Sequence, residues 1–153
     1  MAERDFEELL RLFNKHRVRY CIVGAYAVAF HARPRYTKDI DLVVEPSLQN
    51  GQRIVTALQA FGFGSVKLKP EDFARSGRVV QLGYEPVRVD LLTSIAGCSF
   101  EQIWQHRVQG RYGSQRASFI GHDELIRTKQ ASGRPQDRID LDTLRSQKPS
   151  KKR

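Results

Sequence analysis

The sequence predicts an α/β (α+β) fold in which helices flank a small mixed β-sheet. Amphipathic helical segments alternate with short β-branched segments through the first half of the chain. Two apolar segments, 79–84 and 87–92, are then separated only by Glu85 and Pro86, which predicts an antiparallel hairpin. Because helices separate the early strands and a tight turn joins the later ones, we expect both parallel and antiparallel pairing in the sheet.

The elements of the first half follow from hydrophobic spacing. Phe6, Leu9, Leu10 and Phe13 recur at i, i+3, i+4 and i+7, which predicts an amphipathic helix over 5–15. Segments rich in β-branched, aromatic or apolar residues predict strands over 18–23 and 39–44, a short apolar helix over 25–32, and an amphipathic helix over 48–60.

Turn and capping residues mark the elements of the second half. Ser99 and Gln102 have the spacing of a capping box, so we expect a helix over 99–106 with Phe100, Ile103 and Trp104 in the core. The remaining pattern predicts a helical turn at 70–73, a strand over 111–120, and two helices, 122–132 and 136–145, on either side of Gly133-Arg134-Pro135.

Length and composition favour one globular domain. The chain has 153 residues, of which 40% are hydrophobic and 28% charged. We expect a single domain over 1–145, with its core in 18–120 and C-terminal helices in 122–145, followed by a disordered basic tail, 146–153. No segment approaches the ~20 apolar residues of a membrane span. Cys21 and Cys98 suit neither a disulfide framework nor a zinc site, so we expect a reducing compartment, the cytoplasm, and no membrane partner.

The formal net charge of +9 is concentrated towards the C-terminus. Residues 101–153 carry 12 basic and 6 acidic side chains, whereas residues 1–100 carry 14 and 11. A basic surface favours polyanions such as nucleic acid or nucleotide phosphates. The alternative is a solvated basic face, and for the tail we favour that interpretation.

Three carboxylates occupy strand positions that are normally apolar. Asp39 and Asp41 are two residues apart on one predicted strand, so they project from the same face, and Asp90 interrupts another strand. Burying like charges together is costly unless a cation neutralises them. Mg²⁺ (or Mn²⁺) is the cation that such oxygen ligands favour beside phosphates, and paired ions would stabilise an in-line displacement. The alternative is a set of exposed carboxylates at strand ends.

A phosphate-binding segment is expected just before these carboxylates. Gly24 ends the first strand and starts a helix, so the backbone amides of Gly24 and Ala25 can hold an anion at the helix N-terminus. Arg35 and Thr37 lead into the carboxylate pair and would contact a triphosphate, although a surface salt bridge is the alternative for Arg35. A lone glycine at a strand end usually marks only a turn, so this segment is informative only in combination with the carboxylates.

Three neighbouring residues have a structural interpretation instead. We interpret His31, on an apolar helix, as a satisfied buried histidine. Tyr26 and Tyr36 flank the expected site and are interpreted as packing residues that could also stack a base.

Together, the segments 23–31 and 35–43 resemble the nucleotidyltransferase superfamily with the polymerase-β-like fold. Within it they are most similar to small bacterial AbiEii-type toxins and minimal nucleotidyltransferases. The family pattern is Gly-Ser or Gly-Gly, then Asp-x-Asp, then a third Asp on a later strand. The residues that match it are Gly24, Asp39, Asp41 and Asp90, whereas Ala25 replaces the usual Ser or Gly and retains only its backbone N–H.

The resemblance implies a Mg²⁺-dependent enzyme that moves a nucleoside monophosphate from an NTP, such as ATP, to a hydroxyl on an RNA 3′ end (tRNA, for example) or a protein side chain. It also implies a toxin–antitoxin system, with a cognate antitoxin or toxin as partner. Asp39 and Asp41 would bind the metal, and Asp90 would be a metal ligand and proton acceptor. The nucleotide would be held by Gly24, Ala25, Arg35, Thr37 and Lys129.

The C-terminal helices contain two further matches to this family, Lys129 and Asp140. Each has a structural alternative: Lys129 would face solvent, and for Asp140 we favour a helix-surface pair with Arg134 or Arg138.

Two other function classes stay open. A non-catalytic antitoxin or regulatory binding module with the same fold would need no paired-ion site. A basic nucleic-acid-binding protein with an incidental acidic cluster would keep its affinity for RNA or DNA when the three aspartates are neutralised.

Overall fold

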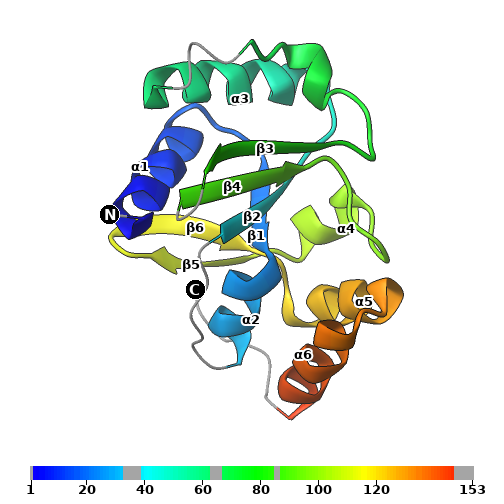
Figure 1. The fold of residues 1–153 in the computed structure, drawn as a ribbon. Coiled ribbons are helices and arrows are strands. Elements are labelled where there is room, and N and C mark those ends of the chain that lie inside the picture. Colours follow the sequence, from blue (N-terminus) through cyan, green and yellow to red (C-terminus); the bar gives the residue numbers. More distant parts are fainter. Residues whose placement is uncertain (1, 33–38, 63–66, 85–86, 147–153) are drawn as a thin grey trace.

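The computed structural model describes residues 2–32, 39–62, 67–84 and 87–146 (Figure 1). Within them, one six-stranded sheet has the order β3-β4-β2-β1-β6-β5. Its strands are β1 (Tyr20–Val23), β2 (Asp39–Val44), β3 (Val79–Tyr84), β4 (Val87–Leu92), β5 (Val108–Tyr112) and β6 (Gln115–Phe119). The helices are α1 (Ala2–Lys15), α2 (Gly24–His31), α3 (Leu48–Phe61), η1 (Pro70–Phe73, a 3-10 turn), α4 (Phe100–Gln105), α5 (His122–Ser132) and α6 (Pro135–Arg145). The predicted fold class is therefore confirmed.

The sheet mixes parallel and antiparallel pairs, but not in the way that the connections suggest. β1 and β2 are antiparallel although a helix joins them, and the parallel pairs are β2 with β4 and β1 with β6. Helix α2 lies beyond the end of β1 and does not run back along the sheet (Figure 1). The chain therefore reverses direction, and β2 returns beside β1.

The prediction of one strand over 111–120 is wrong, because this region belongs to a hairpin. β5 and β6 pair in antiparallel register from Val108 with Phe119 to Tyr112 with Gln115. The turn contains Gly113 in the left-handed region, with φ +59°. A Cβ on Gly113 would overlap the Glu7 side chain, whose Oε2 also accepts a hydrogen bond from the Ser114 hydroxyl at 2.6 Å. Helix α1 and the hairpin are therefore joined at this turn.

Each face of the sheet has its own apolar core. Alternate residues of β1 divide between the two: Tyr20 and Ile22 pack with α1 and α3, whereas Cys21 and Val23 pack with α2, α4 and α5. This is the period-two pattern of a strand covered on both sides. None of the helices in the described part of the chain is long and apolar enough to cross a membrane. The Glu85-Pro86 turn and all but the first residue of the predicted tail, 146–153, lie outside the described residues.

A buried amide holds together the ends of β1 and β2. Asn50 of α3 is fully buried, and its Oδ1 accepts from the Arg19 N–H at 2.8 Å. Its Nδ2 donates to the carbonyl oxygens of Arg19 and Glu45, at 3.1 and 3.0 Å. Asn50 thus satisfies three backbone groups just beyond the last pair of the β1–β2 ladder.

We expect Asn50→Ala to lower the free energy of unfolding by about 2–4 kcal/mol, because three buried backbone groups lose their partner. Denaturant unfolding measures the change. Gln52→Ala, at an exposed position of the same helix, is the control and should change stability by less than about 0.5 kcal/mol. Equal stability of the two variants would contradict this role of Asn50.

Candidate active site

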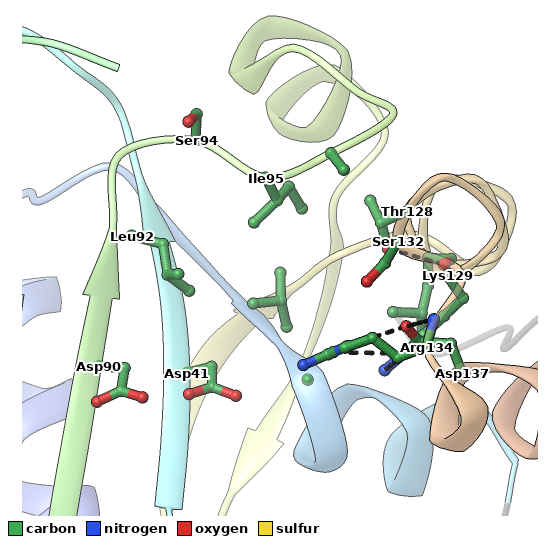
Figure 2. A pocket seen from close by; sticks show the side chains of 14 residues that line it. Asp41, Asp90, Leu92, Ser94, Ile95, Thr128, Lys129, Ser132, Arg134 and Asp137 are labelled. Atoms are coloured by element: carbon green, nitrogen blue, oxygen red, sulfur yellow. Dashed lines mark hydrogen bonds and ion pairs between the residues drawn. The ribbon is translucent and has the colours of Figure 1, made fainter. Parts of the chain in front are cut away.

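The register of β2 and β4 places two of the three predicted aspartates opposite one another. The strands are parallel, with Asp41 paired to Asp90 and Asp39 paired to Arg88. Asp41 is also paired with Val23 of β1, so these carboxylates lie on the face covered by α2, α4 and α5. Figure 2 shows the carboxylates of Asp41 and Asp90 side by side on neighbouring strands.

Arg88 neutralises part of this acidic cluster. Its Nη2 lies 3.1 Å from Asp39 Oδ2 and 3.3 Å from Asp90 Oδ2. One guanidinium nitrogen therefore bridges two of the three aspartates. Arg88 was not predicted as a site residue. Its position two residues before Asp90, on the same strand face, was the available signal.

The surroundings of Asp41 disfavour its ionised form. Burial raises its pKa, the neighbouring Asp90 and Asp39 raise it further, and Arg88 opposes them, so the pKa of Asp41 is about 6. Asp90 Oδ1 is buried and has no hydrogen-bond partner among the described residues. The pair thus contains a concentrated negative charge that the surrounding protein only partly compensates.

Gly24 is required at its position for two reasons. Its φ is +70°, which favours glycine, and a Cβ there would overlap Asp41 Oδ2. Gly24 also begins α2, and Val23 in the N-cap position supplies no side-chain hydrogen bond to the first turn. The backbone N–H groups of an uncapped helix N-terminus, including that of Ala25, favour an anion. The sequence therefore brings an anion-binding helix end against an acidic pair.

A pocket of about 360 Å³ opens at this junction (Figure 2). Asp41, Asp90 and Gly24 line one side of it, and residues of α5 and α6 line the other. Its apolar wall consists of Val23, Leu92, Ile95, Ala96 and Leu125, and its hydroxyl groups come from Ser94, Thr128 and Ser132.

Lys129 lines the pocket, but its ammonium group is held by two buried carboxylates. Lys129 Nζ lies 3.1 Å from both Asp137 Oδ1 and Asp140 Oδ2, and the Lys129 side chain is only 9% exposed. The expected surface pairing of Asp140 with Arg134 or Arg138 is therefore wrong. Asp140 is buried and pairs with Lys129, because it lies on the face of α6 that packs against α5.

Arg134 is the exposed cation of the pocket, and it was not predicted as a ligand-binding residue. Its Nε contacts Asp137 Oδ2 at 3.1 Å, while its side chain remains 71% exposed. The hydrogen bond that Arg134 donates to Asp137 raises the pKa of Arg134, and the charge of Asp41 adds to the shift. Hydrogen bonds from Arg134, Ser132 and Lys129 lower the pKa of Asp137 well below its ordinary value although burial opposes them. Lys129 thus fixes Asp137, which in turn positions Arg134.

The donor set fits a hard divalent cation at the Asp41–Asp90 pair. Two facing carboxylates, one with a buried oxygen lacking a hydrogen-bond partner, match the few protein oxygens that Mg²⁺ uses together with water and substrate phosphates. The described residues contain no group of three His, Cys, Asp or Glu side chains that could hold a metal ion. Asp39 instead contacts Arg88.

Arg35, Thr37 and Tyr36 fall outside the described residues. Tyr26 packs edge-on against Phe6 and Tyr112 and does not line the pocket.

Helix α4 agrees with its structural interpretation, and His31 agrees with it in part. His31 is buried and its Nε2 lies 2.6 Å from the Ile120 carbonyl oxygen, whereas its Nδ1 is buried with no hydrogen-bond partner among the described residues. Ser99 and Gln102 form the predicted capping box, and Phe100 and Ile103 are buried. Trp104 is only partly buried, at the edge of this core.

Comparison with known proteins identifies the fold. No family model matches the chain, and no curated protein matches its sequence. Among solved structures, the lincomycin-bound lincosamide antibiotic adenylyltransferase LnuA is similar, with a TM-score of 0.57 at 15% identity over 95% of this chain and 98% of that one.

Two further structures are similar. The antibiotic-resistance factor ANT(2'')-Ia, in solution, has a TM-score of 0.60 at 11% identity, over 95% of this chain and 85% of that one. An antigenic nucleotidyltransferase-like protein from Paracoccidioides brasiliensis has a TM-score of 0.57 at 14% identity, over 94% of this chain and 75% of that one. The fold is therefore the nucleotidyltransferase fold.

We expect Asp41→Asn to stabilise the chain at pH 7.5 in a chelating buffer. A raised pKa means that folding disfavours the ionised carboxylate, so the cost appears above the unfolded pKa, near 4, and is complete above about 6. The gain should be of order 1–3 kcal/mol at pH 7.5 and should vanish at pH 4. Thermal unfolding at both pH values measures it. Asp142→Asn, at an exposed site on α6, is the control, and a destabilised Asp41→Asn at both pH values would contradict this expectation.

Proposed function

We propose that this protein is a nucleotidyltransferase, which moves a nucleoside monophosphate from an NTP to a hydroxyl group and releases pyrophosphate. The observation that carries the proposal is the facing pair Asp41 and Asp90 beside the uncapped N-terminus of α2. The similarity of the fold to LnuA and ANT(2'')-Ia supports it. Anion-binding amides and a cation-binding carboxylate pair are the two components that a metal–triphosphate substrate requires.

Each group of the pocket has a role in this reaction. The amides of Gly24 and Ala25 and the guanidinium of Arg134 bind the triphosphate, which places its α-phosphorus near the carboxylate pair. Asp90 accepts the proton of the attacking hydroxyl. The hydroxyl oxygen bonds to the α-phosphorus, the bond from that phosphorus to the bridging oxygen breaks, and pyrophosphate leaves with the electron pair.

Asp41 and Asp90 would hold Mg²⁺ or Mn²⁺, with Asp39 as a further ligand when Arg88 moves away. When bound, the metal would stabilise the negative charge on the α-phosphate during the transfer. Arg88 keeps Asp39 and Asp90 in place while the site is empty of substrate, because it contacts both.

The acceptor is a hydroxyl compound whose class stays a hypothesis. An RNA 3′ end and a protein side chain are the acceptors implied by the resemblance to AbiEii-type toxins, together with a toxin–antitoxin role. LnuA is a lincosamide adenylyltransferase, and ANT(2'')-Ia has been seen with adenylyl-2"-tobramycin, so a small antibiotic-like hydroxyl compound is a further candidate. The apolar wall formed by Leu92, Ile95 and Leu125 suits a base or an apolar acceptor surface.

We expect Asp90→Asn to lower kcat by roughly 10²–10⁴-fold with a smaller effect on KM for the NTP, because the missing proton transfer occurs in the transition state. Transfer of label from α-phosphate-labelled NTPs to RNA, protein or small hydroxyl compounds measures both constants. Asp142→Asn on α6 is the control and should retain the wild-type rate. A folded Asp90→Asn chain with full activity would remove Asp90 from the reaction, and wild-type protein inactive with every NTP and acceptor would favour a binding module.

We expect Arg134→Gln to raise KM for the NTP by roughly 10-fold or more with a smaller change in kcat, because the variant cannot make the charge-assisted hydrogen bond to phosphate. Arg138→Gln, exposed on the same helix, should leave KM unchanged. Lys129→Met should instead lower Tm, because the buried Asp140 loses its cation and Asp137 keeps only Arg134. If Lys129→Met folds normally and alone raises KM, the phosphate-binding role belongs to Lys129.

A further inference from the structure

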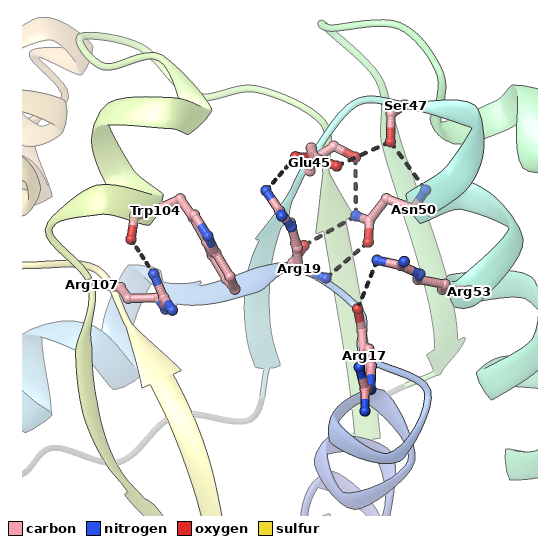
Figure 3. Close-up of polar contacts among 8 residues, drawn as sticks. All are labelled: Arg17, Arg19, Glu45, Ser47, Asn50, Arg53, Trp104 and Arg107. Carbon is pink, nitrogen blue, oxygen red and sulfur yellow. Dashed lines mark hydrogen bonds and ion pairs between the residues drawn. The ribbon is translucent and has the colours of Figure 1, made fainter.

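A second hollow lies at the other end of β1 from Gly24. It has a volume of about 620 Å³, and its lining includes Arg17, Arg19, Arg53, Arg116 and Trp104. These residues come from the α1–β1 connection, α3, α4 and β6, so the tertiary fold and not a single basic segment assembles the cluster. Figure 3 shows Arg17, Arg19 and Arg53 close to one another, with Trp104 beside Arg19.

Most of this positive charge has no acidic partner among the described residues. Arg19 pairs with Glu45 at 3.2 Å. Arg53 uses its Nη1 to donate to the Arg17 carbonyl oxygen at 3.3 Å, which neutralises no charge. No described carboxylate lies within ion-pair distance of Arg17, Arg53 or Arg116. Four guanidinium groups line this hollow, and among them only that of Arg19 has a carboxylate partner within the described residues, so the hollow favours an anion.

Trp104 holds two arginines in fixed orientations. The guanidinium carbon of Arg107 lies 3.7 Å from the centre of the Trp104 ring, and that of Arg19 lies 5.4 Å from it. Arg107 also donates to the Trp104 carbonyl oxygen at 2.6 Å. Of these two arginines only Arg19 lines the hollow. Cation–π stacking restricts the plane of its guanidinium group, so the entropy cost of fixing that group on an anion is already reduced.

This hollow is separate from the candidate active site. The two share none of their lining residues. Tyr20 lines the basic hollow and Val23 lines the active-site pocket, and these residues are the two ends of β1, which is roughly 10 Å long at about 3.3 Å per strand residue. A molecule bound in the basic hollow therefore has to be extended if it also reaches the carboxylate pair.

We propose that this hollow binds the sugar-phosphate backbone of single-stranded RNA. Arginine forks match the paired oxygens of successive phosphates, and several arginines in one hollow require several phosphates in one ligand. A single-stranded segment can enter a hollow of about 620 Å³, whereas a duplex can only lie across it. Proteins that bind RNA usually recognise its single-stranded loops and ends, where the backbone is accessible. The site is independent of nucleotidyl transfer, because none of its residues belongs to the catalytic pocket.

The test is fluorescence anisotropy with a labelled 12-nucleotide unstructured RNA, without NTP and in a chelating buffer. Arg17→Gln/Arg116→Gln removes two exposed charges that form no ion pair among the described residues, so the variant should keep the wild-type Tm. We expect Kd at low salt to rise at least 10-fold. The slope of log K against log salt should fall by about 1.4, at about 0.7 for each phosphate that the variant no longer neutralises.

Arg138→Gln/Arg145→Gln is the matched control, because it removes the same charge from exposed positions of α6. Its Kd should stay within about twofold of wild type, and an equal weakening would mean that net charge alone drives binding. Tighter binding of a duplex of the same sequence, or displacement of the RNA by equimolar tripolyphosphate, would also overturn the proposal. Asp41→Asn/Asp90→Asn should bind RNA at least as tightly as wild type does, so an inactive enzyme leaves this test intact.

Discussion

The mutual repulsion of Asp41 and Asp90 is the constraint around which the candidate site is arranged. The parallel register of β2 and β4 forces the two carboxylates together on a half-buried face. Gly24 must lack a side chain because Asp41 occupies that space, and Arg88 and Arg134 supply the nearby positive charge. A sheet selected for stability alone would have apolar residues at these positions, as β2 has at Val43 and β4 has at Leu92 on the same face. The destabilising pair therefore argues for a role that requires negative charge.

The remainder of the molecule offsets this cost. Two apolar cores cover the two faces of the sheet, and Asn50 satisfies the backbone where β1 and β2 end. The buried Lys129, Asp137 and Asp140 fasten α6 to α5. Replacing such a buried ionic group with apolar residues can be neutral for stability, so its value here lies in geometry: it holds Arg134 over the pocket.

Local patterns in the sequence were sufficient to predict most helices and strands, but not to predict which strands pair with one another. The Asp-x-Asp spacing and the interruption of β4 by Asp90 identified the acidic cluster, because a strand alternates faces in every context. The antiparallel pairing of β1 and β2 depends on where α2 leaves the sheet, and hydrophobic spacing carries no such information. The roles of Arg88, Arg134 and Asp140 depend on cross-strand register and on helix packing. Neither can be read from local sequence, where a charged residue that pairs with another element looks the same as a charged residue on the surface.

The side chains that surround the two ends of β1 carry opposite charges. Carboxylates surround Val23 and Gly24, whereas arginines surround the start of the strand near Tyr20. If the arginines and the carboxylates lay at the same end, they would pair with one another. The arginines would then not be available to an anion, and a guanidinium group would occupy the position of a cation beside the carboxylates, as Arg88 already does in part. Their placement at opposite ends of β1 leaves each set available for its proposed ligand, and because this strand is about as long as the Debye length of about 10 Å, only weak attraction remains between them. An extended polyanion held by the arginines would therefore meet repulsion at the carboxylates unless a cation neutralises that pair, which couples the two sites through charge without a change of shape.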